Sequence, residues 1–290
     1  MSTAKNLLPP AGDIAQYLID TLRTGRPHPG LAVPIGELDT HVMGFRPGDL
    51  IYLSGDRSSG KTALALSIVR TLALKAHVGV LLFSPTQSAD YLVSRLLAAE
   101  CTAGTLSDVR LLRTDTQGFE GLIEAQQRLA KATLIVCDQP NLSWEEFRHF
   151  SLGLQQEIGL IVVDALNGLR SPLSPERETP TTDRLKQLAE QLHLPILALG
   201  PLAISPQSQA DRRPTLGHLD PTHLASPDTI LLTYCPSRYD LTGPDGSPLD
   251  DVMEVIIAKN RYNAEGSVFL HMDPMTLDCR DLAPEWKPTP

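Results

Sequence analysis

Several features that mark particular classes of protein are scarce or absent in this sequence. Its four cysteines are far apart and form no CxxC pair. We therefore expect neither a disulfide framework nor a cysteine metal site, and we predict buried thiols. No apolar run approaches the roughly 18 residues of a membrane span, and the start, MSTAKNLLPP, has no apolar signal-peptide core. These absences predict a cytoplasmic protein without a membrane segment.

Positive charge is also in deficit. The chain has 25 Lys and Arg against 34 Asp and Glu, which gives a formal net charge of −9 at pH 7. A nucleic-acid motor can be acidic overall because its basic groups need only line a channel, yet this balance gives no support to a large exposed basic surface. Hydrophobic residues make up 42% of the 290 positions, which suffices for one large domain with an appendage or for two small domains.

From about residue 48 the chain alternates short apolar runs with helical patterns. The predicted strands are DLIYLS, VGVLLFS, TLIVCD, LIVVDAL, PILALG, TILLTYC, MEVIIAK and SVFLHMD. The predicted helices span about 61–75, 88–101, 118–131, 143–157 and 182–192. Because the early strands are dense in Val, Ile and Leu and have helices between them, the pattern predicts a mostly parallel sheet with helices on both faces. The last strands follow one another directly, which predicts an antiparallel C-terminal edge.

A separate helical pattern precedes this region. The segment DIAQYLIDTLRTG places apolar residues at helical spacing, and Gly25 ends it. No neighbouring segment in the sequence offers it a packing partner. We therefore divide the chain into a tail and helix over residues 1–26, an α/β domain over 27–275 and a tail over 276–290.

The strongest motif fits the pattern GxxxxGK[ST] in full. Its residues are Gly55, Asp56, Arg57, Ser58, Ser59, Gly60, Lys61 and Thr62. Glycines let the backbone wrap closely around phosphates, and the helix that follows directs its positive end at the same anion. In such a loop, Lys61 reaches the β- and γ-phosphates and the Thr62 hydroxyl binds Mg²⁺. Because a predicted strand precedes the motif and a predicted helix follows it, we expect a nucleoside triphosphate site.

A second oxygen ligand for the magnesium ion is expected at the end of a buried strand. Asp164 ends the apolar run LIVVD, and Asp138 ends TLIVCD. An aspartate at the end of a strand is often only a turn former, so both remain candidates. The more uniformly apolar strand favours Asp164.

The residues around these motifs resemble the ATPase domain of DnaB-type hexameric replicative helicases. Residues 34–39 (PIGELD) and 44–50 (GFRPGDL) lead into SGDRSSGKTALALSIV, and the similarity continues through GLIVVDALNGL and RLKQLAEQLHLPILAL to VIIAKNRYNAEGSV. The resemblance covers about residues 13–272. It implies a RecA-like P-loop fold, ATP and Mg²⁺ as cofactors, a hexameric ring and a role in DNA replication. It also implies that the N-terminal primase-interacting domain of the family is missing.

The resemblance assigns roles to two further regions. In that family the linker helix docks on the adjacent subunit, which would explain the lone helix at about residues 13–24. A helix folded back on its own domain is the alternative. The family also places a lysine and an arginine finger near the neighbour's γ-phosphate, and Lys259 and Arg261 match that motif. A planar guanidinium binds two phosphate oxygens at once; two solvated cations on an edge strand are the alternative.

Three departures from the family pattern fall on its chemistry. Where the family reads Ser-Leu-Glu-Met, with the glutamate polarising the attacking water, this chain reads Ser-Pro-Thr-Gln. Thr86 thus occupies the catalytic place and cannot act as a general base near neutral pH, while Gln87 could orient a water but sits one residue away. Gly200 and Pro201 replace a Ser-Gln pair that senses the nucleotide. Asp220 stands where an arginine holds DNA, and a carboxylate repels phosphate.

Together these departures spare the phosphate loop and remove the base, the sensor and the DNA clamp. The sequence therefore predicts an ATP-binding, DnaB-like protein with impaired hydrolysis and weakened contacts to single-stranded DNA, unless Arg212 and Arg213 restore them. It would assemble with itself, or with another helicase or replication protein. An active ATP-driven helicase or translocase of a phage, plasmid or mobile element is the alternative, which the extent of the resemblance and Arg261 favour.

Overall fold

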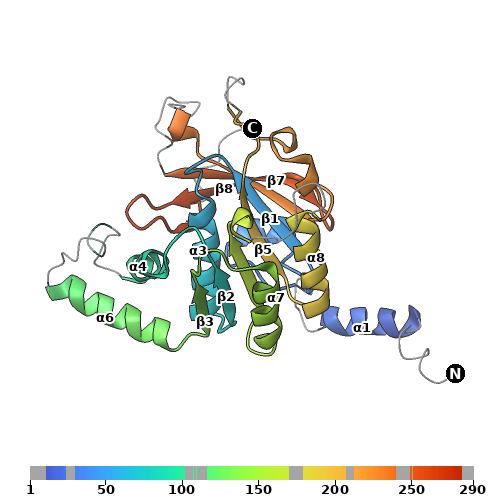
Figure 1. The fold of residues 1–290 in the computed structure, drawn as a ribbon, viewed down its shortest axis with the longest axis horizontal. Coiled ribbons are helices and arrows are strands. Elements are labelled where there is room, and N and C mark those ends of the chain that lie inside the picture. The colour runs from blue at the N-terminus through green and yellow to red at the C-terminus, as the bar shows by residue number, and fades with distance from the viewer. Residues whose placement is uncertain are drawn as a thin grey trace.

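A twisted nine-stranded sheet runs through the molecule (Figure 1). The computed structural model describes residues 11–23, 30–101, 107, 109, 116–169, 179–206, 212–239, 249 and 251–282. The strands are β1 (Leu50–Gly55), β2 (Val80–Phe83), β3 (Leu134–Cys137), β4 (Leu160–Asp164), β5 (Ile196–Pro201), β6 (Thr229–Tyr234), β7 (Val252–Asn260), β8 (Gly266–Met272) and β9 (Cys279–Asp281). The α-helices are α1 (Ala11–Arg23), α2 (Gly36–Val42), α3 (Lys61–Leu74), α4 (Ala89–Glu100), α6 (Thr116–Ala130), α7 (Trp144–Gly153) and α8 (Thr181–Leu192).

The strand order is β3-β2-β4-β5-β1-β6-β7-β8-β9. The first six strands pair in parallel, whereas β7, β8 and β9 extend the sheet in antiparallel pairs. This confirms the predicted α/β fold with its antiparallel C-terminal edge. β1 lies between β5 and β6, so the loop that follows β1 opens where the carboxyl ends of several parallel strands meet.

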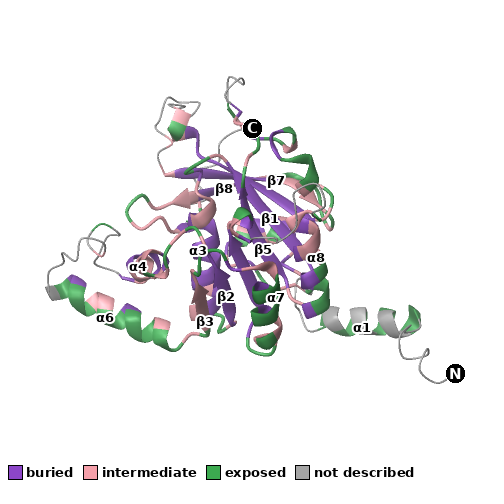
Figure 2. Ribbon diagram, viewed as in Figure 1, coloured by how far each residue is buried: buried purple, intermediate pink, exposed green. Residues whose placement is uncertain are grey.

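Two apolar layers cover the sheet, one on each face. Ile51 and Leu53 of β1 pack into the layer that contains α3, while Leu50 and Tyr52 pack into the layer that contains α7 and α8. Successive residues of a strand point to opposite faces, so a strand that is buried on both faces must be apolar throughout. Figure 2 shows these central strands almost wholly buried.

Two elements that the sequence pattern did not predict belong together. α2 has no side-chain cap of its own at its N-terminus. Instead the Asp281 carboxylate of β9 accepts the backbone N–H groups of Gly36 (2.9 Å) and Glu37 (3.0 Å). A capping partner about 245 residues away leaves no local signal, which is why the helix was missed.

The predicted N-terminal helix is present as α1, which lies at the edge of the molecule and points away from the sheet (Figure 1). The predicted domain boundary at residue 26 lies outside the described residues, and the three-part division remains a prediction. All four cysteines are free thiols, and Cys101, Cys235 and Cys279 are buried. None of the described helices has the length and hydropathy to cross a membrane.

Candidate nucleotide-binding site

A tight loop follows β1, and α3 begins with Lys61 at the end of this loop. A Cβ atom on Gly55 would lie 2.7 Å from the backbone oxygen of Thr233, and one on Gly60 would lie 2.6 Å from Met253 Sδ. Gly60 also has a left-handed φ of 90°. Glycine is required at both positions, and the tight loop leaves the first N–H groups of α3 as a backbone cradle of the kind that binds phosphates.

Three of the predicted site residues meet at the start of α3. Thr62 Oγ1 donates a hydrogen bond to Asp164 Oδ2 over 2.8 Å, and Asp164 is the buried last residue of β4. Lys61 Nζ donates to the backbone oxygens of Gly55 (2.9 Å) and Asp56 (2.7 Å). The loop therefore holds the ammonium group beside a hydroxyl–carboxylate pair.

Burial shifts the ionisation of both charged groups. Burial lowers the pKa of Lys61 below its ordinary value, and the nearby Asp164 and Asp56 carboxylates oppose that shift. Burial also raises the pKa of Asp164, against the hydrogen bond from Thr62 and the charge of Lys61. Each group thus stabilises the charged form of the other.

The alternative carboxylate, Asp138, lies at a different point of the sheet edge. Its Oδ2 accepts the backbone N–H of Ala89, the first residue of α4, over 2.7 Å. A carboxylate at a helix N-terminus satisfies an otherwise unpaired donor and faces the positive end of the helix. This gives Asp138 a structural role apart from the Thr62–Asp164 pair.

These groups fit a magnesium nucleotide. A hydroxyl and a carboxylate are the hard oxygen ligands that Mg²⁺ prefers, and an ammonium group with a glycine-bounded loop suits a triphosphate. No cluster of three or more His, Cys, Asp or Glu side chains that could hold another kind of metal site occurs within the part of the chain that is described.

Comparison with known proteins agrees with this geometry. The family model of the DnaB-like helicase C-terminal domain matches residues 30–278. The chain belongs to this family. It is 31% identical over 248 residues to the replicative DNA helicase DnaB of Geobacillus stearothermophilus, a match that covers 83% of this chain and 54% of the relative. The chain thus spans about half the length of that relative.

Two solved structures show the same fold. One is an ATPase domain that superposes with a TM-score of 0.84 at 19% identity and covers 95% of this chain and 100% of its own. The other is a DnaB-like replicative helicase, with a TM-score of 0.82 at 20% identity, covering 93% of this chain and 66% of its own. These likenesses establish the RecA-like arrangement of strands in this DnaB-family chain.

The sequence predicts Thr86 at the place of a catalytic glutamate, with Gln87 one residue further on. Thr86 Oγ1 points to the backbone oxygen of Asp164 over 3.4 Å. The Gln87 side chain reaches further, and its Nε2 lies 3.3 Å from Thr62 Oγ1 and 3.4 Å from Asp164 Oδ2. Gln87, which lies one position after the expected catalytic residue, therefore contacts both Thr62 and Asp164. Only the course of the chain after β2 reveals this reach.

The two residues predicted as the finger motif, Lys259 and Arg261, lie at the end of β7 and directly after it. Arg261 Nη1 contacts Asp228 Oδ1 over 2.8 Å, although 62% of the Arg261 side chain is exposed. Lys259 Nζ donates to the backbone oxygens of Leu224 and Ala225, both over 2.9 Å. Lys259 pairs with Ile230 near the start of β6, whereas the phosphate loop follows the other end of the neighbouring β1. Both cations are therefore remote from the phosphate loop of their own chain.

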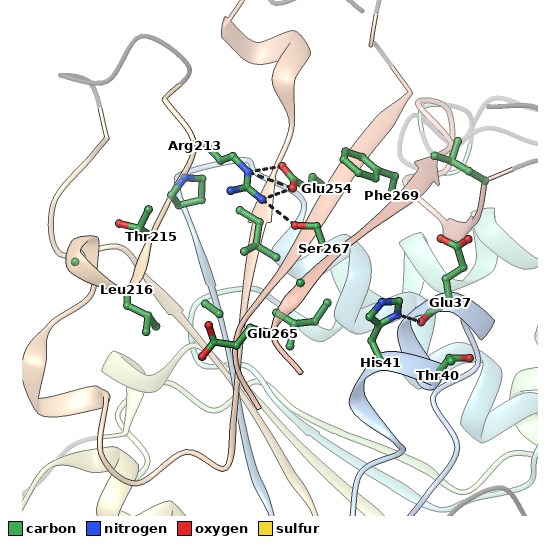
Figure 3. A pocket seen from close by; sticks show the side chains of 17 residues that line it. Glu37, Thr40, His41, Arg213, Thr215, Leu216, Glu254, Glu265, Ser267 and Phe269 are labelled. Carbon is green, nitrogen blue, oxygen red and sulfur yellow. Dashed lines mark hydrogen bonds and ion pairs between the residues drawn. The ribbon is translucent and has the colours of Figure 1, made fainter. Parts of the chain in front are cut away.

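The two residues suggested as substitute DNA contacts are engaged within the chain. Arg213 Nε lies 3.1 and 2.9 Å from the two carboxylate oxygens of Glu254, and Arg213 Nη2 donates to Ser267 over 2.8 Å (Figure 3). The Arg212 guanidinium lies 5.2 Å from the centre of the Tyr239 ring. Asp220 caps a 3₁₀ turn, Pro221–His223, by accepting the backbone N–H of Thr222 over 2.9 Å.

The Arg213–Glu254 pair borders a cavity of about 1310 Å³ over β7, β8 and α2 (Figure 3). Ile256 and Phe269 contribute apolar lining, and Glu265 lies at the same cavity. None of the residues predicted for nucleotide binding lines it. This cavity is thus separate from the phosphate loop.

Proposed function

We propose that this chain binds Mg-ATP at its phosphate loop and hydrolyses it slowly, as the ATPase domain of a DnaB-family assembly. The observation that carries the proposal is the contact of Gln87 with Thr62 and Asp164. An amide orients a water molecule, but unlike the family's carboxylate it accepts no proton near neutral pH. Water is therefore positioned without being deprotonated.

The other groups retain their parts in phosphate binding. Lys61 leaves one or both backbone carbonyls and binds phosphate oxygens, while the loop N–H groups hold the remainder of the anion. Thr62 and Asp164 would hold a magnesium ion, and the ion would neutralise charge on the phosphates. Positioning and charge stabilisation by these residues sustain a residual turnover without a general base.

The position of Arg261 supports assembly with further copies of this chain. Arg261 and Lys259 lie near the start of the parallel strands β1 and β6, whereas the phosphate loop follows the end of β1. A phosphate that they bind therefore belongs to another copy. We propose a homo-oligomeric ring, with the helix at 11–23 docking on the next copy. Contacts to single-stranded DNA are weak, and another helicase or replication protein is a candidate partner. The proposed units remain residues 1–26, 27–275 and 276–290.

Two measurements test this function. Calorimetry should detect Mg-ATP or Mg-ADP binding by the wild-type protein, and Lys61→Ala should weaken it. Steady-state ATP hydrolysis, measured with and without single-stranded DNA, should be slow and little stimulated. Absence of nucleotide binding at millimolar ligand would refute the proposed site.

An active DNA helicase or translocase is the second candidate, and the exposed Arg261 at the far sheet edge favours it. Such an enzyme would turn over at roughly 1–100 s⁻¹ by analogy with other phosphoryl-transfer sites. A wild-type rate in that range would decide for the motor and against slow hydrolysis.

A further inference from the structure

The Asp56 side chain joins the phosphate loop to two other segments. Its Oδ2 accepts hydrogen bonds from Ser205 Oγ (3.2 Å) and Tyr239 Oη (3.1 Å), and its Oδ1 accepts the backbone N–H of Arg57 (2.7 Å). Ser205 follows β5, and Tyr239 ends the 3₁₀ helix Pro236–Tyr239, which follows β6. One carboxylate therefore fastens three loops at the same edge of the sheet.

Neighbouring side chains pack against the Tyr239 ring, and hydrogen bonds stabilise the ionised form of Asp56. The Tyr239 ring stacks on Tyr234 with centroids 5.8 Å apart and an interplanar angle of 18°, and the Arg212 guanidinium lies 5.2 Å from the Tyr239 centroid. Burial raises the pKa of Asp56, but hydrogen bonds from Arg57, Tyr239 and Ser205 outweigh burial and bring this pKa below its ordinary value. Asp56 is therefore an anion inside a loop built to bind anions.

The main chain of the same residue contacts the phosphate-binding cation. Lys61 Nζ donates to the backbone oxygen of Asp56 over 2.7 Å. When the ammonium group turns toward a phosphate, its bond to Asp56 changes. The side chain of Asp56 is bonded to Ser205 and Tyr239, so any movement of Asp56 would act on both of these segments.

We propose that Asp56 is a positioning residue that couples phosphate binding to the segments after β5 and β6 through Ser205 and Tyr239. The proposal rests on the nucleotide site proposed above. A carboxylate near a bound phosphate repels it, and the two hydroxyl donors reduce that repulsion by holding the carboxylate and sharing its charge. The coupling is reciprocal, because a ligand that displaces Tyr239 changes nucleotide affinity by the factor with which the nucleotide changes that ligand's affinity.

A double-mutant cycle on the full-length chain tests the coupling, with Mg-ADP as the probe and calorimetry as the readout. Tyr239→Phe should weaken binding by about three- to tenfold, the scale of one ordinary hydrogen bond. Asp56→Asn should bind more tightly than wild type because the repulsion is removed. In the Asp56→Asn background, Tyr239→Phe should change affinity by less than about twofold, since the charge that it shields is gone.

A matched control lies at the opposite edge of the sheet. Tyr262 Oη also donates to an aspartate, Asp49, over 2.7 Å, and Tyr262→Phe should leave Mg-ADP affinity unchanged. A second readout is hydrogen exchange at residues 203–205 and 236–239, which Mg-ADP should alter in wild type and leave unaltered in Ser205→Ala/Tyr239→Phe. A nucleotide-dependent change in exchange distinguishes coupling from a merely structural role.

The outcomes separate this inference from the nucleotide site itself. If Tyr239→Phe has the same effect on affinity with Asp56 and with Asn at position 56, the coupling does not exist although the nucleotide site stands. If wild-type protein fails to bind Mg-ADP, the nucleotide site and the coupling fall together. Loss of thermal stability in Tyr239→Phe with unchanged affinity also overturns the coupling.

Discussion

The phenol of Tyr52 occupies the space in which a side chain at Gly200 would lie. A Cβ atom on Gly200 would fall 2.4 Å from Tyr52 Oη and 2.8 Å from its Cε2. Tyr52 lies in β1 and Gly200 in the adjacent parallel strand β5. Tyr52 is almost wholly buried, and burial raises the pKa of its phenol to about 12. The bulk of Tyr52 therefore explains why glycine stands at position 200.

This relationship predicts an unequal cost of adding a side chain at Gly200. Gly200→Ser should lower the free energy of unfolding by about 1–3 kcal/mol, because the added side chain would overpack the core around Tyr52. The same substitution in a Tyr52→Val background should cost less, since the phenol is gone. Denaturant unfolding of the four proteins measures both costs, and equal costs would show that Tyr52 is not the cause.

Turnover should respond to the two residues that follow Pro85. Thr86→Glu should raise the rate of ATP hydrolysis at least several-fold, because a general base typically contributes on the order of 10²–10⁴-fold. Gln87→Ala should lower the residual rate, because the amide that reaches Thr62 and Asp164 is removed. The exposed Asp90→Asn on α4 is the control. A Gln87→Ala rate equal to wild type would exclude Gln87 from positioning the water.

Stability at acid pH should depend on Asp228. This buried carboxylate accepts Lys186 Nζ and the backbone N–H of Leu50. Burial raises its pKa, but the bonds from Lys186, Leu50 and Arg261 prevail, so the folded pKa lies below the ordinary value. The stabilisation is therefore fully present above the unfolded pKa of about 3.9 and is lost as pH falls through the lower folded pKa.

Asp228→Asn should accordingly cost on the order of 3 kcal/mol near neutral pH, because Lys186 loses its buried partner. The difference in unfolding free energy between wild type and Asp228→Asn should shrink at low pH, where the wild-type carboxylate is protonated. Arg261→Gln is the control and should change stability little, since the Arg261 side chain is largely exposed. Denaturant unfolding between neutral pH and pH 3 measures the trend, and a pH-independent difference would contradict it.

Self-association should depend on α1. Deleting residues 1–26 should reduce the mass measured by light scattering, because a helix directed away from its own sheet is available to another copy. Ile19, which is 46% exposed, provides a point variant: Ile19→Asp should act like the deletion, and the polar Gln16→Ala should not. The comparison is made with and without Mg-ATP. An unchanged mass would place α1 against its own subunit.

Binding to single-stranded DNA should be weak and nearly independent of salt. Each phosphate contact adds about 0.7 to the logarithmic salt slope for single strands. Asp220 is a carboxylate at the expected arginine position, and Arg213 is bound to Glu254 and Ser267. Fluorescence anisotropy over a range of salt concentrations should give a slope below about 1. Tight binding with a slope of several units would reveal another basic surface.

Local patterns were enough to predict most of the fold. The eight longest strands, the main helices and the phosphate loop follow from apolar periodicity and from one motif, because each depends on residues that are neighbours in the chain. The antiparallel edge was also predictable, since consecutive strands without helices between them can only pair back on one another or on a neighbour. β9, with only three residues, is too short for such a pattern.

The sequence alone determined that a phosphate loop would stand between a buried strand and a helix, because the glycine spacing, Lys61 and Thr62 form one continuous segment. Only the tertiary structure decided which groups surround that loop. It brings Asp164 to Thr62 across 102 positions and Tyr239 to Asp56 across 183. Asp138 instead caps the N-terminus of α4. These contacts depend on strand order and loop course, and a hydrogen bond between residues so far apart leaves no periodic trace in either segment.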